Sequence, residues 1–309
     1  MKMLHSVGEL SLLKGPIVLA AGTFDGVHLG HQALILRAMQ EASACGGTAV
    51  VMTFDRHPAA LLRPEKAPKL LTRNDRKIAL LEGMRVQSLL MLSFTSELAS
   101  VTARDFIASL VSSASPLHAV CVGREWFFGK GGEGNVGLLR ELGGVGNFSV
   151  IQIDPVMVEG SPISSTRIRG AIASGNLMEA AACLGRTFLL SGTVVSGAGL
   201  GAKIGFPTAN LEVSGMQLPP NGVYAVKVLC GSELLKGVCN IGLRPTVDAS
   251  ATTPVVEVHL FDVSGDLVGE NLSLEFMGLM RSEQKFSGIE ELKAQIACDC
   301  KSARERLSS

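Results

Sequence analysis

The feature that most constrains this fold is a change in hydrophobic pattern near Gly185. Before it, short apolar runs alternate with segments of helical periodicity, which predicts a parallel sheet covered by helices on both faces. After it, short β-type segments follow one another between glycines and prolines, which favours an antiparallel barrel or sandwich. A chain of 309 residues is longer than one ordinary core fills. We therefore expect two domains, residues 1–185 and 186–309.

The pattern places individual elements in both halves. In the first half, strands are predicted at Ile17–Ala21, Ala49–Phe54, Ser88–Phe94, His118–Val122 and Ser149–Ile153. Helices between them are predicted at His31–Ser43, Asp75–Glu82 and Ala103–Ser112, the last one capped by Thr102 with Asp105. In the second half, β segments are predicted at Leu190–Val195, Val223–Leu229, Gly237–Ile241, Val255–Phe261 and Leu272–Phe276, followed by a closing helix at about Ile289–Leu307.

Charge and cysteine content exclude several classes of function. Lysine and arginine number 28, as do aspartate and glutamate, so the chain has no overall basic charge with which to bind DNA, RNA or an anionic membrane. The seven cysteines form no Cys-x-x-Cys pair, which argues against a zinc ribbon and favours reduced thiols. The apolar run Pro16–Ala21 is too short for a signal peptide or a membrane span. We expect a cytoplasmic protein; no oligomeric state follows from the sequence.

The stretch Gly22–His31 connects the first predicted strand to the first predicted helix. His28 and His31 are three residues apart, so they project from one face at the start of that helix. The helix N-terminus attracts anions, and Gly30 lets a phosphate approach the backbone. Two imidazoles at this place suit charge stabilisation on an α-phosphate. Taken alone, the motif fits equally well with two capping or exposed histidines.

A second stretch, Ile163–Arg169, follows the last predicted strand of the first half. Its hydroxyls, backbone N–H groups and arginines make a phosphate cradle at a helix start. Standing alone, it would be explained better as a Ser/Thr helix cap with a solvated arginine face. Because both stretches follow strands of one parallel sheet, a single nucleotide could contact both at the carboxyl ends of the strands.

The second half contains two weaker signals. The glycine-rich segment Gly197–Asn210 is either a backbone cradle for phosphate or a hairpin, and the pattern alone favours the hairpin. Within it, Thr208 and Asn210 carry the hard oxygen ligands that Mg²⁺ prefers. In the predicted strand around Glu257, strand alternation puts Glu257 and His259 on one face. The pattern alone favours a solvated sheet face there.

Four segments resemble, in chain order, motifs of the prokaryotic bifunctional riboflavin kinase/FAD synthetase family: Gly22–His31, Phe54–Pro58, Gly123–Asn135 and Ile163–Arg169. The resemblance implies a nucleotidyltransferase-type α/β domain that adenylylates FMN. It places His28 and His31 at the α-phosphate of ATP. The residues that it implies for the rest of the ATP and its pyrophosphate are Gly22, Phe24, Asp25, Gly30, Ser164, Ser165, Thr166 and Arg169.

The same resemblance implies flavin contacts from Glu125, Trp126 and Phe128. This loop departs from the family pattern, which usually has Asn or Asp at position 125, Phe at 126 and Arg at 127. Asn135 also stands where the family usually has Asp. The departures affect the expected flavin contacts more than the expected ATP contacts.

Four segments of the second half resemble successive riboflavin kinase motifs: Gly205–Asn210, Asn240–Thr246, Glu257–Leu260 and Arg281–Phe286. The resemblance implies a β-barrel in which Thr208 and Asn210 bind MgATP and Glu257 is the general base for the riboflavin 5′-hydroxyl. It also implies phosphate contacts from Gly199, Gly201 and Lys203 and a flavin contact from Arg281. The family often has arginine at position 202, where this chain has Ala202. Lys203 follows one position later.

The resulting hypothesis is a bifunctional enzyme that converts riboflavin to FMN and FMN to FAD, with ATP as co-substrate, Mg²⁺ as metal and no permanently bound cofactor. Its expected partners are riboflavin, FMN, FAD and ATP, without nucleic acid or membrane. One alternative is an FMN adenylyltransferase whose barrel is only a flavin-binding or regulatory module. A fragment of a class I aminoacyl-tRNA synthetase is disfavoured, because the chain is short and lacks both a KMSKS-like segment and a basic surface. A non-catalytic scaffold would not need Glu257 or the paired histidines.

Overall fold

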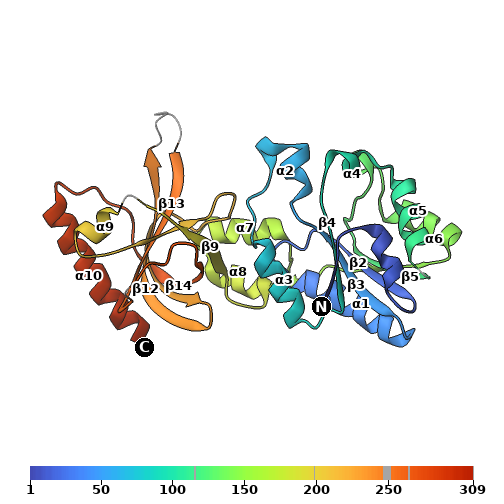
Figure 1. Cartoon of the computed structure of the whole chain (residues 1–309), viewed down its shortest axis with the longest axis horizontal. Helices are drawn as coiled ribbons and strands as arrows, with labels where there is room; N and C mark the ends of the chain where they lie inside the picture. The colour runs from blue at the N-terminus through green and yellow to red at the C-terminus, as the bar shows by residue number, and fades with distance from the viewer. Residues whose placement is uncertain (115, 198, 246–251, 264, 309) are drawn as a thin grey trace. The chain divides into compact units, whose positions relative to one another are not determined.

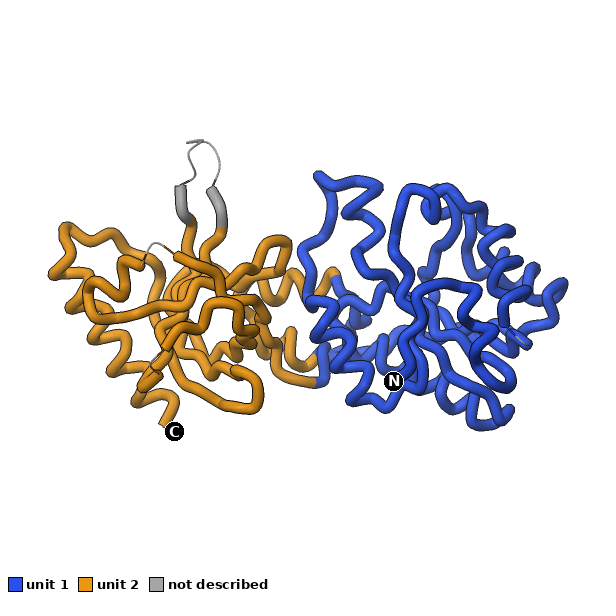
Figure 2. Tube along the Cα trace, in the orientation of Figure 1, with its two compact units in different colours: residues 1–165, 183–185 blue, residues 166–182, 186–309 orange. Residues whose placement is uncertain are grey.

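The structure is a computed structural model that describes residues 1–114, 116–197, 199–245, 252–263 and 265–308 (Figure 1). The chain divides into two compact units, residues 1–165 with 183–185 and residues 166–182 with 186–309 (Figure 2). Thr246, which ends the motif Asn240–Thr246, lies outside the described residues. Within the described part of the chain, no helix is long and apolar enough to cross a bilayer.

The first unit is built on a six-stranded sheet of order β1-β4-β3-β2-β5-β6, in which every neighbouring pair is parallel. Its strands are β1 (Lys2–Leu4), β2 (Ile17–Ala21), β3 (Thr48–Phe54), β4 (Ser88–Leu92), β5 (Leu117–Gly123) and β6 (Ser149–Ile153). The predicted parallel sheet is confirmed, and β1 is an additional edge strand. The chain reverses its direction of winding between β2 and β5, so a ligand is expected beyond the carboxyl ends of these strands.

Helices cover both faces of this sheet, as the apolar strands predicted. They are α1 (Leu29–Ala44), α2 (Pro58–Leu62), α3 (Asn74–Gly83), α4 (Ser96–Ser100), α5 (Ala103–Ser113) and α6 (Val136–Gly146), with 3₁₀ turns at Val7–Leu12, Pro64–Lys66 and Lys130–Gly132. Strand alternation divides the core in two. Ile17 and Leu19 pack with residues of α5 and α6, whereas Val18 and Ala20 pack with residues of α1 and α3.

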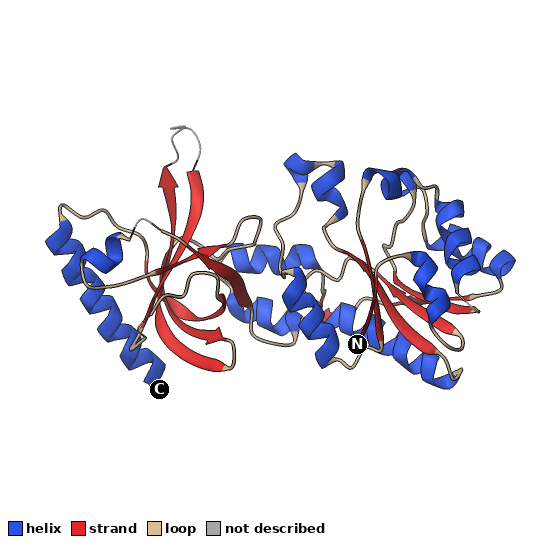
Figure 3. Cartoon of the chain, viewed as in Figure 1, coloured by secondary structure: helices blue, strands red, loops and turns tan. Residues whose placement is uncertain are grey.

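The second unit is a closed antiparallel barrel of order β10-β13-β12-β11-β14-β9 (Figure 3). Its strands are β9 (Leu189–Val195), β10 (Ala209–Glu212), β11 (Gly222–Cys230), β12 (Glu233–Pro245), β13 (Thr252–Leu260) and β14 (Asn271–Arg281). The short helix α9 (Leu200–Lys203) lies between β9 and β10, and the closing helix is α10 (Ile289–Ser308). Ala303 and Leu307 of α10 pack with Val223 and Val238 of the barrel. The predicted barrel and closing helix are confirmed.

The segment between the sheet and the barrel contains a two-stranded hairpin and two helices. The hairpin pairs β7 (Met157–Val158) with β8 (Ser161–Pro162), and the helices are α7 (Ser165–Ala173) and α8 (Leu177–Leu184). Both helices cross the division between the two units.

Candidate active sites

The turn between β2 and α1 presents the two histidines of the first motif. His28 is buried and is the N-cap of α1, where its Nδ1 accepts a hydrogen bond of 3.2 Å from the backbone N–H of His31. The two imidazole rings stack, with centroids 3.5 Å apart and an angle of 18° between their planes. Because Nδ1 of His28 accepts a hydrogen bond, the proton of the neutral ring is on Nε2, which is therefore a donor.

The neighbouring residues fix this pair. The buried Phe24 meets the His31 ring edge-on, with centroids 5.2 Å apart. Phe24 and Val27 both have a positive φ (49° and 40°), so the turn holds a tight backbone conformation. A Cβ atom on Gly30 would lie 3.2 Å from the His28 ring, so glycine leaves room for that imidazole. The folded turn thus holds the histidine pair in place.

Asp25 is buried within the same turn. Its carboxylate accepts hydrogen bonds from the backbone N–H groups of Leu71, at 3.0 and 3.1 Å, and Thr72, at 3.1 Å. The backbone carbonyl of Asp25 accepts a 3.0 Å hydrogen bond from Oγ of Ser165, the first residue of α7. The first motif and the start of the second are therefore tied together within the first unit. The Asp25 carboxylate itself holds the 71–72 segment.

The remaining residues of the second motif continue into α7. Ser164 and Ser165 belong to the first unit, whereas Thr166 and Arg169 lie on the part of α7 that belongs to the second unit. Arg167 donates a 2.8 Å hydrogen bond to Glu179 of α8.

A small apolar pocket of about 170 Å³ lies beside the loop that follows β5. Trp126 and Phe128 line it and stack on each other, with ring centroids 4.5 Å apart. Gly22 also lines it, so the pocket adjoins the first motif. Glu125 is exposed and is not one of the lining residues. Of the three expected flavin contacts, the structure brings together the two aromatic ones.

The barrel contains a larger pocket of about 540 Å³. Six residues that the sequence analysis selected line it: Gly199, Gly201, Thr208, Asn210, Glu257 and Arg281. Lys203, in contrast, is exposed on α9 and does not line the pocket. The pocket wall also includes Phe206, Phe286, Leu292 and Ile296, so a polar floor meets an apolar flank.

The polar floor is a row of side chains on three adjacent strands. Glu257 of β13 lies opposite Asn210 of β10 and opposite Asn240 of β12. Residues opposite one another in antiparallel strands point to the same face, and all three line the pocket. The sequence analysis did not select Asn240, although it lies in the quoted motif Asn240–Thr246. Its proximity to Glu257 depends on strand register, which the motif alone does not give.

Further contacts position the glycine-rich segment against this row. Nδ1 of His259 donates a 2.7 Å hydrogen bond to the carbonyl of Pro207, so β13 holds the residue next to Thr208. A Cβ on Gly201 would lie 3.1 Å from Oγ1 of Thr208, and a Cβ on Gly197 would overlap the Asn210 amide. Burial raises the pKa of the neighbouring Cys239 thiol, and the negative charge of Glu257 adds to the rise. Cys239 is therefore a neutral thiol and not a competing nucleophile.

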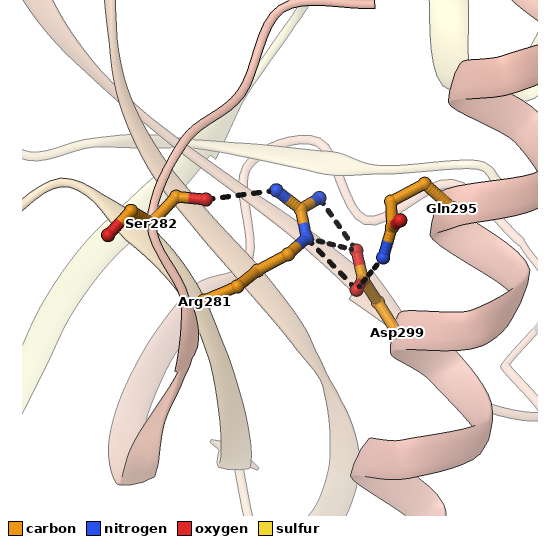
Figure 4. A network of polar contacts seen from close by, with 4 residues as sticks. All are labelled: Arg281, Ser282, Gln295 and Asp299. Carbon is orange, nitrogen blue, oxygen red and sulfur yellow. Dashed lines mark hydrogen bonds and ion pairs between the residues drawn. The ribbon is translucent and has the colours of Figure 1, made fainter.

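Arg281 joins the end of β14 to the closing helix α10 (Figure 4). Its Nε donates to both carboxylate oxygens of Asp299, at 3.0 and 3.1 Å, and its Nη2 donates at 2.7 Å. Its Nη1 donates to the carbonyl of Ser282, and Asp299 also accepts a hydrogen bond from Gln295. Arg281 lines the pocket, but each of its three guanidinium nitrogens donates a hydrogen bond within the protein. The sequence analysis missed Asp299, whose only signal is a carboxylate between the apolar residues of an amphipathic helix.

Family profiles match the two halves separately. A profile described as FAD synthetase matches residues 12–167, and one described as riboflavin kinase matches residues 184–307. The protein named bifunctional riboflavin kinase/FMN adenylyltransferase from Escherichia coli (strain K12) is 39% identical over 307 residues, which cover 99% of this chain and 97% of that protein. The protein of the same name from Bacillus subtilis (strain 168) is 37% identical over 306 residues, covering 97% and 96%.

One solved structure is similar over both units. It is described as a macrolide-efflux protein from Streptococcus pneumoniae, is 30% identical and has a TM-score of 0.81, with 98% of this chain and 99% of that chain covered.

Proposed function

The chain belongs to the bifunctional riboflavin kinase/FMN adenylyltransferase family, and from that premise we propose which of its residues carry each reaction. As a member, it phosphorylates riboflavin to FMN and transfers AMP to FMN to form FAD, with ATP as co-substrate of both reactions. The observation that carries the assignment is that each unit has its own polar site beside an apolar pocket: the stacked histidines in the first and the Glu257 row in the second.

We assign adenylyl transfer to residues 1–185. A phosphate oxygen of FMN attacks the α-phosphorus of ATP, and the bond from that phosphorus to pyrophosphate breaks. His28, through its Nε2–H, and His31 stabilise the charge that develops on the α-phosphate oxygens. Ser164, Ser165, Thr166 and Arg169 hold the departing pyrophosphate at the start of α7. The ring of FMN occupies the apolar pocket beside Trp126 and Phe128, where stacking on aromatic side chains is favourable.

We assign the kinase reaction to the barrel pocket. The oxygen of the riboflavin 5′-hydroxyl attacks the γ-phosphorus of ATP while Glu257 accepts the proton of that hydroxyl, and ADP departs. Asn210 and Asn240, on either side of Glu257, orient the reacting groups by hydrogen bonds to their amides. The apolar flank with Phe286, Leu292 and Ile296 takes the uncharged flavin ring.

The donor set in this pocket fits Mg²⁺. Thr208 and Asn210 offer hydroxyl and amide oxygens, and glycine at 197 and 201 keeps the space beside them open. Among the residues that the structure describes, no three His, Cys, Asp or Glu side chains form a metal-binding group. We therefore propose that Thr208 and Asn210 hold the ion together with ATP phosphates and water. A bound ion would neutralise charge on the transferred phosphate.

We further propose that residues 1–185 carry the adenylyltransferase and residues 186–309 the kinase. The limits of the two matching family profiles, 12–167 and 184–307, support this division. A cytoplasmic location is also proposed, and it is supported by the seven cysteines, among which the structure shows no disulfide in its described residues.

The test is to incubate the purified full-length protein with riboflavin, ATP and Mg²⁺, and to separate riboflavin, FMN and FAD by chromatography. The wild type forms FMN and then FAD. His31→Ala stops at FMN, with FAD formation slowed by ~10²–10³. Glu257→Gln slows riboflavin phosphorylation by ~10²–10⁴ but still converts added FMN to FAD.

Glu233→Gln is the control, because Glu233 is exposed at the start of β12 and lies outside the pocket. It should behave as the wild type in both reactions. If either active-site substitution slows both reactions equally while the protein stays folded, the assigned roles are wrong.

A further inference from the structure

Lys77 of α3 is buried among backbone carbonyls at the carboxyl edge of the sheet. The residue is only 6% exposed, and a lysine is seldom buried to that extent. Its Nζ donates to the carbonyl oxygens of Thr23 and Phe54, both at 3.3 Å. Burial lowers the pKa of the Lys77 ammonium, and the negative charges of Asp25 and Asp55 oppose that shift. Nothing in the two reactions described so far uses this lysine.

The two carbonyls belong to adjacent strand ends. Phe54 is the last residue of β3, and Thr23 follows β2, its neighbour in the sheet. Oγ1 of Thr53 also donates to the Thr23 carbonyl, at 2.9 Å. Two groups therefore connect the backbone after β2 to β3 by hydrogen bonds: the hydroxyl of Thr53 and the ammonium group of Lys77. Five residues after Thr23, the same backbone reaches His28.

A second connection runs in the opposite direction. Asp25 binds the backbone N–H groups of Leu71 and Thr72, which lead into α3. Asp25 of the turn thus binds the backbone before α3, and Lys77 of α3 binds the backbone of the turn. Asp55, the second carboxylate near Lys77, likewise accepts a 3.1 Å hydrogen bond from the backbone N–H of Phe94. Both carboxylates therefore still have backbone donors when Lys77 is replaced. Replacing Lys77 therefore acts mainly on the Thr23 and Phe54 carbonyls.

We propose that Lys77 is a positioning residue for adenylyl transfer, whose ammonium group holds the Thr23–Asp25 turn against the end of β3 and so fixes His28 and His31. The inference rests on the proposed role of the two histidines. Misplacing a reacting group by about 1 Å costs on the order of 10² in rate, so a small movement of this turn would be visible in catalysis. The phosphate contacts of ATP come largely from other residues, so its binding should change less than turnover.

The experiment is a double-mutant cycle in the full-length protein, with FMN and MgATP as substrates. Lys77→Met keeps the length and apolar stem of the side chain but removes its N–H donors and charge. It is expected to lower kcat for FAD formation by ~10–100-fold, with smaller changes in the KM values for ATP and FMN. Lys77→Arg, which keeps a charged donor, should recover part of that loss. Lys66→Met removes an exposed lysine and should leave the rate unchanged.

The decisive comparison is made in the His28→Asn background. If Lys77 acts through His28, Lys77→Met adds little further loss there, because residues that act as a unit are not additive. An unchanged kcat in Lys77→Met, or an equal fold-loss in both backgrounds, overturns the inference. A His28→Asn variant with full activity would instead refute the proposed role of the histidine.

Folding is checked by the emission of Trp126, the only tryptophan of the chain, which belongs to the first unit. Should Lys77→Met not fold, the same cycle is run with Lys77→Gln, which keeps a donor but is too short to reach both carbonyls. If every substitution at position 77 prevents folding, the inference is also overturned, because Lys77 would then be required for stability and not for positioning.

Discussion

At the scale of single residues, His28 has an observed structural role and a proposed chemical role. Its Nδ1 caps α1 by accepting the His31 N–H, and the proposed mechanism assigns its Nε2–H to the α-phosphate. Asparagine is among the best N-cap residues, whereas alanine is a poor one. Substitution by each of the two therefore separates capping from catalysis.

We predict that His28→Asn and His28→Ala both slow FAD formation from FMN by ~10²–10³, because both remove the imidazole donor. Only His28→Ala should also lower the free energy of unfolding, by about 1 kcal/mol, because it loses the cap. Initial rates and urea unfolding followed by Trp126 fluorescence measure the two effects. An asparagine variant with the wild-type rate would show that the imidazole is needed only as a cap.

The residues to which we assign chemistry could be selected from the sequence where one short motif contains them. His28, His31 and Glu257 are of this kind, since each lies in a motif of recognisable spacing. Lys77, Asn240 and Asp299 were not predictable, because their partners come from other elements: strand ends for Lys77, a neighbouring strand for Asn240, and β14 for Asp299. The roles proposed for the motif residues stay predictions until the variants are measured.

At the scale of elements, the apolar pattern predicted most of the sheet and barrel. Ile17–Ala21 and Ser149–Ile153 are confirmed with the same bounds, and so is the cap of α5, where Thr102 accepts a 3.1 Å hydrogen bond from the N–H of Asp105. β12 extends well beyond the predicted Gly237–Ile241. Glu233, Leu234 and Lys236 at its start are exposed, so pairing with β11, and not an apolar pattern, makes this part of it a strand. β1 and β10 are too short to give a periodic signal.

The contact between β14 and α10 is the element-scale feature that the sequence did not predict. Asp299 is buried and accepts hydrogen bonds from Arg281 and Gln295. A charged hydrogen bond of this kind contributes about 1.5–3 kcal/mol. Arg281 and Asp299 both line the barrel pocket to which we assign the kinase reaction.

We predict that Asp299→Asn lowers the free energy of unfolding of the barrel by about 1.5–3 kcal/mol, because Arg281 loses its counter-charge. It should also raise the KM for riboflavin, because the segment after Arg281 forms part of the pocket wall. Calorimetric or urea unfolding and kinase kinetics measure these effects. Asp262→Asn is the matched control: its ion pair with Arg304 is exposed to solvent, so no measurable change is expected. Equal effects of the two substitutions would contradict the account.

At the scale of the whole molecule, each unit contains one of the two pockets described above. The residues lining the apolar pocket near Trp126 all belong to the first unit, and those lining the 540 Å³ pocket all belong to the second. The change of pattern near Gly185 predicted two domains, but the grouping of residues 166–182 with the barrel could not be foreseen. α8 has residues in both units, and the hydrophobic period of a helix does not indicate the unit to which it belongs.

The central claim is that the two reactions take place at two independent sites linked by FMN. The most direct test is to mix His31→Ala, which should make FMN but not FAD, with Glu257→Gln, which should adenylylate FMN but not phosphorylate riboflavin. We predict that the mixture, given riboflavin and MgATP, forms FAD after a lag in which free FMN accumulates, although neither variant alone does so. A mixture of folded variants in which riboflavin persists, or in which FMN accumulates without FAD, would contradict the claim.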